Sequence, residues 1–136
     1  MPNHMLAVPA VHGSIGIWPV AVEHGRVVFE ATPSARFFNP MALVHGGWTA
    51  MLLDTAMGCA VHSVLASGQS YATVDLHTSF VRPVRDRPGG LRCEARLLHL
   101  GSWIATAEGR VYDATELLLA HGTETCQIFV MRPGSA

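Results

Sequence analysis

The chain has 136 residues and a formal net charge of −1 at neutral pH, a length that suits one domain with its own hydrophobic core. Hydrophobic residues make up 49% of the sequence and charged residues 14%, which excludes a disordered segment and a coiled coil. The 9 basic residues are all arginine and face 10 acidic ones, so no basic face is available for nucleic acid. We predict one domain over residues 1–136, with part of its surface covered by a partner.

Cysteine usage and apolar patterning predict where the protein resides. Cys59, Cys93 and Cys126 lie far apart and form neither a CxxC pair nor a metal-binding spacing, so we expect reduced thiols, no metal and a cytoplasmic location. The first residues lack the cationic start and the long apolar run of a signal peptide. The most apolar stretch, residues 48–66, carries Asp54 near its middle, which argues against a membrane span.

In chain order, two strands are expected first, over residues 15–22 and 26–32, because apolar runs are bounded there by turn residues. A loop over residues 36–43 follows. One helix is then expected over residues 47–66, where Ala, Leu and Met dominate. Apolar residues cover nearly every face of this helix, which predicts that it is buried. Gly68 is expected to cap its C-terminus.

Strands occupy the rest of the chain, and they are expected over residues 71–82, 91–100, 103–112 and 117–131. Alternation along the first of them assigns its side chains to two faces, with Val74, Leu76 and Phe80 on one and Thr73, Asp75 and His77 on the other. One buried helix with a mostly antiparallel sheet of about five to six strands is an α+β fold.

Asp54 is the sharpest irregularity of the sequence, because it is the only Asp, Glu, Lys or Arg between Phe37 and Gln69. Burying an unpaired carboxylate inside an apolar helix is costly. Two interpretations are open. The carboxylate is either hydrogen-bonded to a neighbouring loop, or it is kept dry to act as a base or nucleophile.

His45-Gly46-Gly47 stands at the start of the same helix. A helix N-terminus presents free N–H groups and partial positive charge, which suits an oxyanion hole and equally an ordinary glycine-rich helix start. Gly46 and Asp54 are eight residues apart, or about 12 Å along a helix axis. If both act on one carbonyl group, they come from different subunits, so we predict an active site at a dimer interface.

These residues carry a family resemblance. The run NPMALVHGGWTAMLLDTAMGCAV, followed by YATVDLHTSFVRP, resembles the hotdog-fold acyl-CoA thioesterases of the phenylacetic-acid-degradation type. The likeness covers roughly residues 15–131. It implies the hotdog fold, in which a sheet wraps one long central helix, and it implies assembly into homodimers or homotetramers.

The resemblance also implies roles for the matching residues. Asp54 would be the general base or nucleophile, and the Gly46 N–H would polarise the thioester carbonyl group. Asn39 and His45 would orient the thioester or the attacking water, and Thr73 would hold the water or the carboxylate from the subunit that supplies Asp54. On the alternation given above, however, Thr73 shares the face of Asp75 and His77, which could be read as an acid–base pair or as surface residues.

A set of further residues is predicted to bind substrate. Arg82, Arg85 and Arg87 cluster after the strand over residues 71–82, where they either contact the phosphates of coenzyme A or form a solvated turn. By resemblance, backbone groups of the turn near residues 100–103 line the nucleotide groove. The predicted substrate-binding set is therefore Gly47, Arg82, Arg85, Gly101, Ser102 and Trp103.

The sequence as a whole predicts an acyl-CoA thioesterase that releases a carboxylic acid and coenzyme A and needs no cofactor, since coenzyme A is part of its substrate. Asp54 either activates water or attacks the carbonyl carbon to form an anhydride. The alternatives are a non-catalytic acyl-CoA binder or sensor and, ranked lower, an acyl-thioester hydratase. The acyl group and the choice between dimer and tetramer are left open by the sequence.

Overall fold

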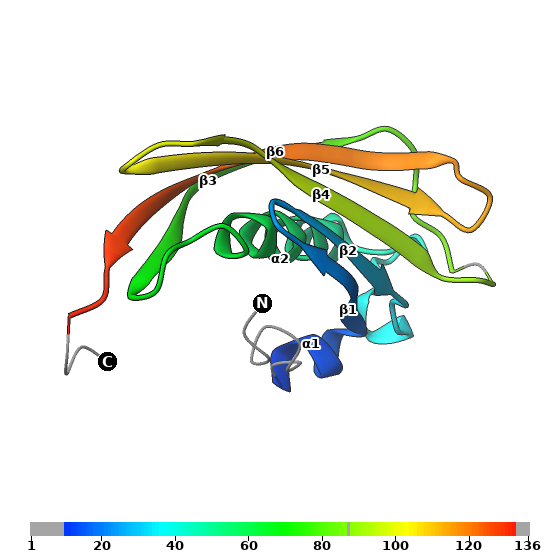
Figure 1. Ribbon diagram of the computed structural model, residues 1–136. Helices are drawn as coiled ribbons and strands as arrows, with labels where there is room; N and C mark the ends of the chain where they lie inside the picture. The colour runs from blue at the N-terminus through cyan, green and yellow to red at the C-terminus, as the bar shows by residue number, and fades with distance from the viewer. Residues whose placement is uncertain (1–9, 87, 133–136) are drawn as a thin grey trace.

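The computed structural model describes residues 10–86 and 88–132 (Figure 1). Its elements are α1 (Ala10–Ile15), β1 (Ile17–Glu23), β2 (Arg26–Ala31), the 3-10 helix η2 (Ala35–Phe37), α2 (Gly46–His62), β3 (Gln69–Phe80), β4 (Leu91–Leu100), β5 (Ile104–Asp113) and β6 (Leu118–Val130). The strands form one antiparallel sheet in the order β1-β2-β4-β5-β6-β3. The sheet curves over α2 (Figure 1), which confirms the predicted α+β hotdog architecture.

Helix α2 forms the centre of the hydrophobic core. Its Leu52, Leu53 and Met57 are fully buried, and each such side chain contributes about 1.5–3 kcal/mol of hydrophobic stabilisation. Gly109 of β5 permits this close approach, because a Cβ atom there would lie 3.0 Å from Leu53 and 3.2 Å from Met57. The predicted burial of the helix is confirmed.

The C-terminus of α2 differs from the prediction. The helix ends at His62, and the expected cap at Gly68 is wrong: that residue, with φ of 84°, belongs to the turn before β3. The hydroxyl of Ser63 explains the earlier end. It donates to the carbonyl oxygen of Ala60 at 2.7 Å and accepts from the Gly25 N–H at 2.7 Å, so it satisfies a helix carbonyl and ties the helix end to the β1–β2 turn.

The short helix α1 was not expected, because Ile15 was assigned to a strand. The carbonyl oxygen of Ile15 accepts a hydrogen bond from the indole nitrogen of Trp48 at 2.8 Å, which fixes α1 against α2. Gly16, with φ of 76°, then turns the chain into β1. A six-residue helix is too short to be stable by itself, so this contact supplies stability that local sequence does not.

A β-bulge in β3 corrects the predicted alternation. The pairing with β6 shifts register between Thr73 and Asp75, so Val74 is the extra residue and is 59% exposed. Before the bulge, Thr73 faces α2 and hydrogen-bonds Asp54. After it, Leu76 packs against the core. Bulges re-aim side chains in this way, and alternation counted straight through the strand placed both Thr73 and Val74 on the wrong face.

Strand β3 is also an edge of the sheet, since β6 is its only neighbour in the strand order. Twelve residues long, it leaves a row of backbone N–H and C=O groups without partners in the sheet. Phe80 at its end is 54% exposed, and Val81 just beyond it is 45% exposed. A long, partly apolar edge is a ready template for pairing with another strand.

Gly122 of β6 lies tightly against the backbone of β3, and this contact leads to a first prediction. A Cβ atom on Gly122 would lie 2.4 Å from the backbone oxygen of His77, and backbone cannot move aside cheaply. We expect Gly122→Ala to lower the free energy of unfolding by about 1–3 kcal/mol, the usual cost of overpacking, in urea titrations followed by circular dichroism. Gly13→Ala, where nothing lies within 4 Å, serves as control. Equal midpoints for Gly122→Ala and the wild type would contradict the prediction.

Candidate active site

The first turn of α2 presents one free backbone donor. His45 is the N-cap, and its Nδ1 accepts from the Gly47 N–H at 2.8 Å, while its carbonyl oxygen accepts from the Trp48 N–H at 3.0 Å. Among the residues that the structure describes, none offers an acceptor to the Gly46 N–H. A single unpaired, partly exposed donor at the positive end of a 17-residue helix can bind a developing oxyanion.

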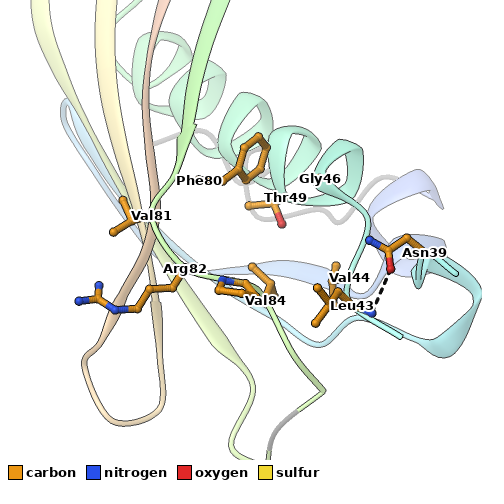
Figure 2. Close-up of a pocket in the computed structure, with 10 residues that line it drawn as sticks. Asn39, Leu43, Val44, Gly46, Thr49, Phe80, Val81, Arg82 and Val84 are labelled. Carbon is orange, nitrogen blue, oxygen red and sulfur yellow. Dashed lines mark hydrogen bonds between the residues drawn. The ribbon is translucent and has the colours of Figure 1, made fainter. Parts of the chain in front are cut away.

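Asn39 lies in the loop that leads to this helix start. Its Oδ1 accepts hydrogen bonds from the N–H groups of Met41 at 2.9 Å and Leu43 at 3.2 Å. These two bonds fix the side-chain oxygen within the loop and leave the amide nitrogen as the group that can donate toward a ligand (Figure 2). Asn39 and Gly46 therefore offer two donors on the same side of the molecule.

A cavity of about 320 Å³ opens beside these two donors (Figure 2). It is lined by Asn39, Leu43, Val44, Gly46, Thr49, Phe80, Val81, Arg82, Pro83 and Val84. The Phe80 ring would lie 3.1 Å from a Cβ atom on Gly46, so a glycine there lets the ring cover the helix start. The cavity is mostly apolar, with a few polar groups at its rim, as small-molecule sites usually are.

Two carboxyl groups meet at a second place, further along α2. The Thr73 hydroxyl lies 3.1 Å from Asp54 Oδ1 and 3.0 Å from Glu124 Oε1, and the Cys126 thiol donates to the same Glu124 oxygen at 3.1 Å. Asp54 is half-buried, so its carboxylate is less shielded from water than the interpretation of a dry base or nucleophile requires. Glu124 is the buried one, with 1% of its surface exposed.

Burial is the main reason why the Glu124 carboxyl group is hard to ionise, and the adjacent Asp54 adds to it. Together they raise the pKa of Glu124 to about 8. The sequence analysis missed this residue. The signal was available, because Glu124 alternates with Ala120, Gly122, Cys126 and Ile128, which all point to the core side of β6, and a charge in such a series marks an inward-facing acid.

The predicted site residues thus fall into groups. Asn39, Gly46 and Arg82 line one cavity, with His45 and Gly47 at the adjoining helix start, whereas Asp54 and Thr73 form the carboxylate cluster with Glu124. Arg82 and Arg85 line a smaller cavity of about 130 Å³. Gly101, Ser102 and Trp103 lie in the β4–β5 turn, where Trp103 is 78% exposed, and they join neither cavity. Arg87 lies outside the described residues.

Two searches of the described residues concern metals and membranes. Across residues 10–86 and 88–132, no group of three or more His, Cys, Asp or Glu side chains is arranged to hold a metal ion. Across the same residues, no helix combines the length and the apolar character needed to cross a membrane.

Comparison with known proteins gives this arrangement a family. The sequence profile of the Thioesterase superfamily matches residues 41–120, the segment that carries the helix start, Asp54, Thr73 and all the residues that line the larger cavity except Asn39. The chain belongs to the thioesterase superfamily. A protein of Halobacterium salinarum whose name proposes an esterase is 40% identical to this chain over 83 residues, which is 60% of the chain and 53% of that protein. The match therefore spans about half the length of that relative.

Two further relatives cover more of the chain. The proofreading thioesterase EntH of Klebsiella pneumoniae is 34% identical over 99 residues, covering 73% of this chain and 71% of EntH. The crystal structure of a phenylacetic acid degradation-related protein from Ralstonia eutropha, described as a thioesterase, superposes with a TM-score of 0.83 at 31% identity. It covers 92% of this chain and 96% of that one. The resemblance to the phenylacetic-acid-degradation type is confirmed.

The raised pKa of Glu124 generates a prediction about stability. Between about pH 4.5 and pH 8 the folded chain keeps a proton that the unfolded chain has lost, so unfolding releases a proton and rising pH favours the unfolded state. The contribution of this group is complete below pH 4.5 and falls as pH rises toward 8. We expect Glu124→Gln, which cannot ionise, to flatten the pH dependence of the unfolding free energy across this range.

Urea titrations at several pH values measure this effect. Glu30→Gln is the matched control, because Glu30 is exposed on β2 and its substitution removes the same charge from water. Parallel pH curves for the wild type and Glu124→Gln would contradict the prediction.

Proposed function

We propose that this thioesterase hydrolyses acyl-CoA thioesters, with Asp54 as general base or nucleophile and the Gly46 N–H as the donor to the carbonyl oxygen. The observation that carries the proposal is the state of Asp54. It is the only acid in α2, it is half-buried, and Thr73 holds one of its oxygens at 3.1 Å. A carboxylate in such surroundings can take a proton from water or attack a carbonyl carbon.

The chemistry needs both halves of the site. The Gly46 N–H, joined by the Asn39 amide, would stabilise the negative charge on the thioester oxygen as the tetrahedral intermediate forms. In the general-base route, Asp54 takes a proton from the attacking water, the carbon–sulfur bond breaks, and the proton returns to the departing thiolate. In the nucleophilic route, an Asp54 oxygen attacks the carbonyl carbon, and the carbon–sulfur bond breaks to leave an anhydride and a thiolate. Water then opens the anhydride, which releases the acid, regenerates Asp54 and supplies the proton that the thiolate takes. Both routes end in a carboxylic acid and coenzyme A.

Pairing of two β3 edges, one from each protomer, would bring Asp54 of one protomer and the Gly46 N–H of the other together. Thr73 stands beside Asp54, and Phe80, seven residues along the same strand, stands beside Gly46. In an antiparallel pair related by a two-fold axis near the middle of this segment, Thr73 of one copy lies level with Phe80 of the other. Asp54 of one protomer would then face Gly46 of its partner, so the proposed assembly is a homodimer or a dimer of such dimers.

The coenzyme A part of the substrate has a place on the same surface. Arg82 borders the cavity beside Gly46, and the smaller cavity next to it is lined by Arg82 and Arg85. Arg82 donates to the carbonyl oxygen of Leu118 at 2.6 Å, which anchors its guanidinium at the start of β6. Two arginines at one rim suit the phosphates of coenzyme A.

Loss of Asp54 tests the reaction itself. We expect Asp54→Asn to lower kcat by about 10²- to 10⁴-fold, because the amide neither accepts a proton nor attacks a carbonyl. Thiol release is measured with acetyl, medium-chain, long-chain, phenylacetyl and hydroxybenzoyl thioesters of coenzyme A. Asp75→Asn is the control, since Asp75 lies on the outer face of β3 and binds the Thr125 N–H. Normal turnover by Asp54→Asn would refute the mechanism, and tight binding without turnover by the wild type would favour an acyl-CoA sensor.

Substitution of Gly46 tests the donor. Proline suits this first position of a helix, and the extended backbone of His45, with φ of −58° and ψ of 133°, suits a residue before proline. Gly46→Pro removes the N–H, whereas Gly46→Ala keeps it and adds a Cβ atom at the same place. We expect about a 10²- to 10³-fold loss of kcat in the proline variant and a much smaller loss in the alanine variant. Equal losses would show that the contact with Phe80 matters, and the N–H does not.

The same variants test the shared site. In a mixed dimer of Asp54→Asn with Gly46→Pro, one site carries both lesions and the other carries neither. Random association of equal amounts should therefore restore about a quarter of wild-type turnover, because half of the dimers are mixed and each has one intact site. A site contained within one subunit would give no recovery.

A further inference from the structure

The Thr73 hydroxyl lies between two carboxyl groups and cannot donate to both. Its Oγ1 is 3.1 Å from Asp54 Oδ1 and 3.0 Å from Glu124 Oε1, and a hydroxyl carries a single proton. Two carboxylates on either side of one hydroxyl would leave one of these contacts without a hydrogen. A neutral acid on one side removes the negative charge that would otherwise face the hydroxyl oxygen, so this geometry favours a proton on one of the two acids.

The groups that surround Glu124 show where that proton can come from. Asp54 faces it from α2 and Cys126 lies beside it on β6. Tyr71 of β3 and Cys59 of α2 belong to the same cluster of interacting groups, and Ala107, the β5 residue paired with Glu124, has nothing to titrate. Each of these named groups is neutral or acidic, so none of them offsets a second negative charge.

Of the two acids, Glu124 is the one whose surroundings favour the protonated form. Its side chain is 1% exposed, whereas Asp54 is half-buried, and the more buried of two acids is the one that stays neutral. Its Oε2 is buried without a hydrogen-bond partner, which is costly for a bare carboxylate oxygen. A proton on Oε2, donated to the neighbouring Asp54 carboxylate, removes that cost.

We propose that Glu124 is a positioning residue for Asp54: it stays protonated, donates from Oε2 to the Asp54 carboxylate and accepts at Oε1 from Cys126, which leaves the Thr73 hydroxyl free to donate to Asp54. The proposal rests on the proposed function, in which Asp54 acts on the thioester. The pair carries one negative charge, and one Asp54 oxygen is held while the other remains free to act. Glu124 itself touches neither substrate nor water, because its side chain is buried.

The neutral glutamine variant tests this arrangement. Glu124→Gln reproduces a protonated glutamate, with an amide nitrogen that donates to Asp54 and an oxygen that accepts from Cys126. We expect it to keep kcat within about threefold of wild type at pH 7, since one neutral donor replaces another. Glu124→Leu removes both functions, and we expect it to lower kcat by about ten- to hundredfold, the usual cost of losing a group that orients a reacting ligand. Glu30→Gln again controls for the lost charge.

The pH profile supplies a readout that a merely structural role would not move. In the wild type, loss of the Glu124 proton near pH 8 would place two carboxylates side by side, and kcat should fall as Asp54 is pushed from its position. In Glu124→Gln this alkaline decline should disappear. Infrared spectra should show a protonated carboxylic acid at pH 7 in the wild type and none in Glu124→Gln, whether or not either protein turns over substrate.

Separate outcomes distinguish failure of this proposal from failure of the proposed function. Turnover that survives Asp54→Asn sinks the proposed mechanism. An inactive Asp54→Asn, together with wild-type kcat and pH profile in Glu124→Leu, overturns the role of Glu124 alone. If Glu124→Leu does not fold, an alkaline decline retained by Glu124→Gln, or an unchanged infrared spectrum, overturns it equally.

Discussion

Burial of α2 beneath the curved sheet is the constraint on which the rest of the structure depends. The described part of the chain has one long helix, and that helix must fill the core while also supplying polar groups of the site. Gly46 and Gly47 at its start, and Asp54 further along, are among its residues that are not fully buried. The free Gly46 N–H and the half-buried Asp54 occur at those two places, so the geometry of the site follows from how the helix is covered.

The edge strand β3 connects these two places. Near its start, the bulge at Val74 lets Thr73 face the carboxyl groups. At its end, Phe80 covers Gly46. One open edge thus contacts both the Asp54 cluster and the helix start at Gly46. Pairing of that edge with a second copy would place the Asp54 cluster of one protomer beside the Gly46 helix start of the other. The Gly46 N–H and Asp54 lie too far apart along one helix to act on the same carbonyl group. In the proposed dimer, each would instead act with its counterpart from the other protomer.

Much of this was predictable from sequence, because strong periodic signals and a specific motif agree. The six strands, the buried helix and the family follow from apolar patterning and from the run around His45-Gly46-Gly47. The errors arise where tertiary contacts override local pattern. Alternation through β3 fails at Val74 because a bulge adds one residue, and α2 ends early because Ser63 bonds the β1–β2 turn. Helix α1 exists because Trp48 bonds the backbone at Ile15.

The site was predicted less completely than the fold, and the reason is physical. A motif identifies residues near each other in the chain, such as Asn39, His45 and Gly46. Glu124 comes from the last strand, 70 residues after Asp54, and only the sheet order brings the two acids together. Alternation in β6 was enough to predict that Glu124 points inward, but it could not predict that Asp54 lies beside it. Roles assigned to Asp54 and Thr73 remain proposals, supported by a geometry that places them in contact.

The proton retained by Glu124 also changes the overall charge of the folded molecule. The formal net charge of −1 counts every glutamate as ionised. With the pKa of Glu124 at about 8, the folded chain at neutral pH carries one negative charge fewer, and its net charge is close to zero. Copies of the molecule then repel one another very little through their overall charge. Association through a partly apolar edge such as β3 then meets no long-range electrostatic barrier, and the protein is expected to be least soluble near neutral pH.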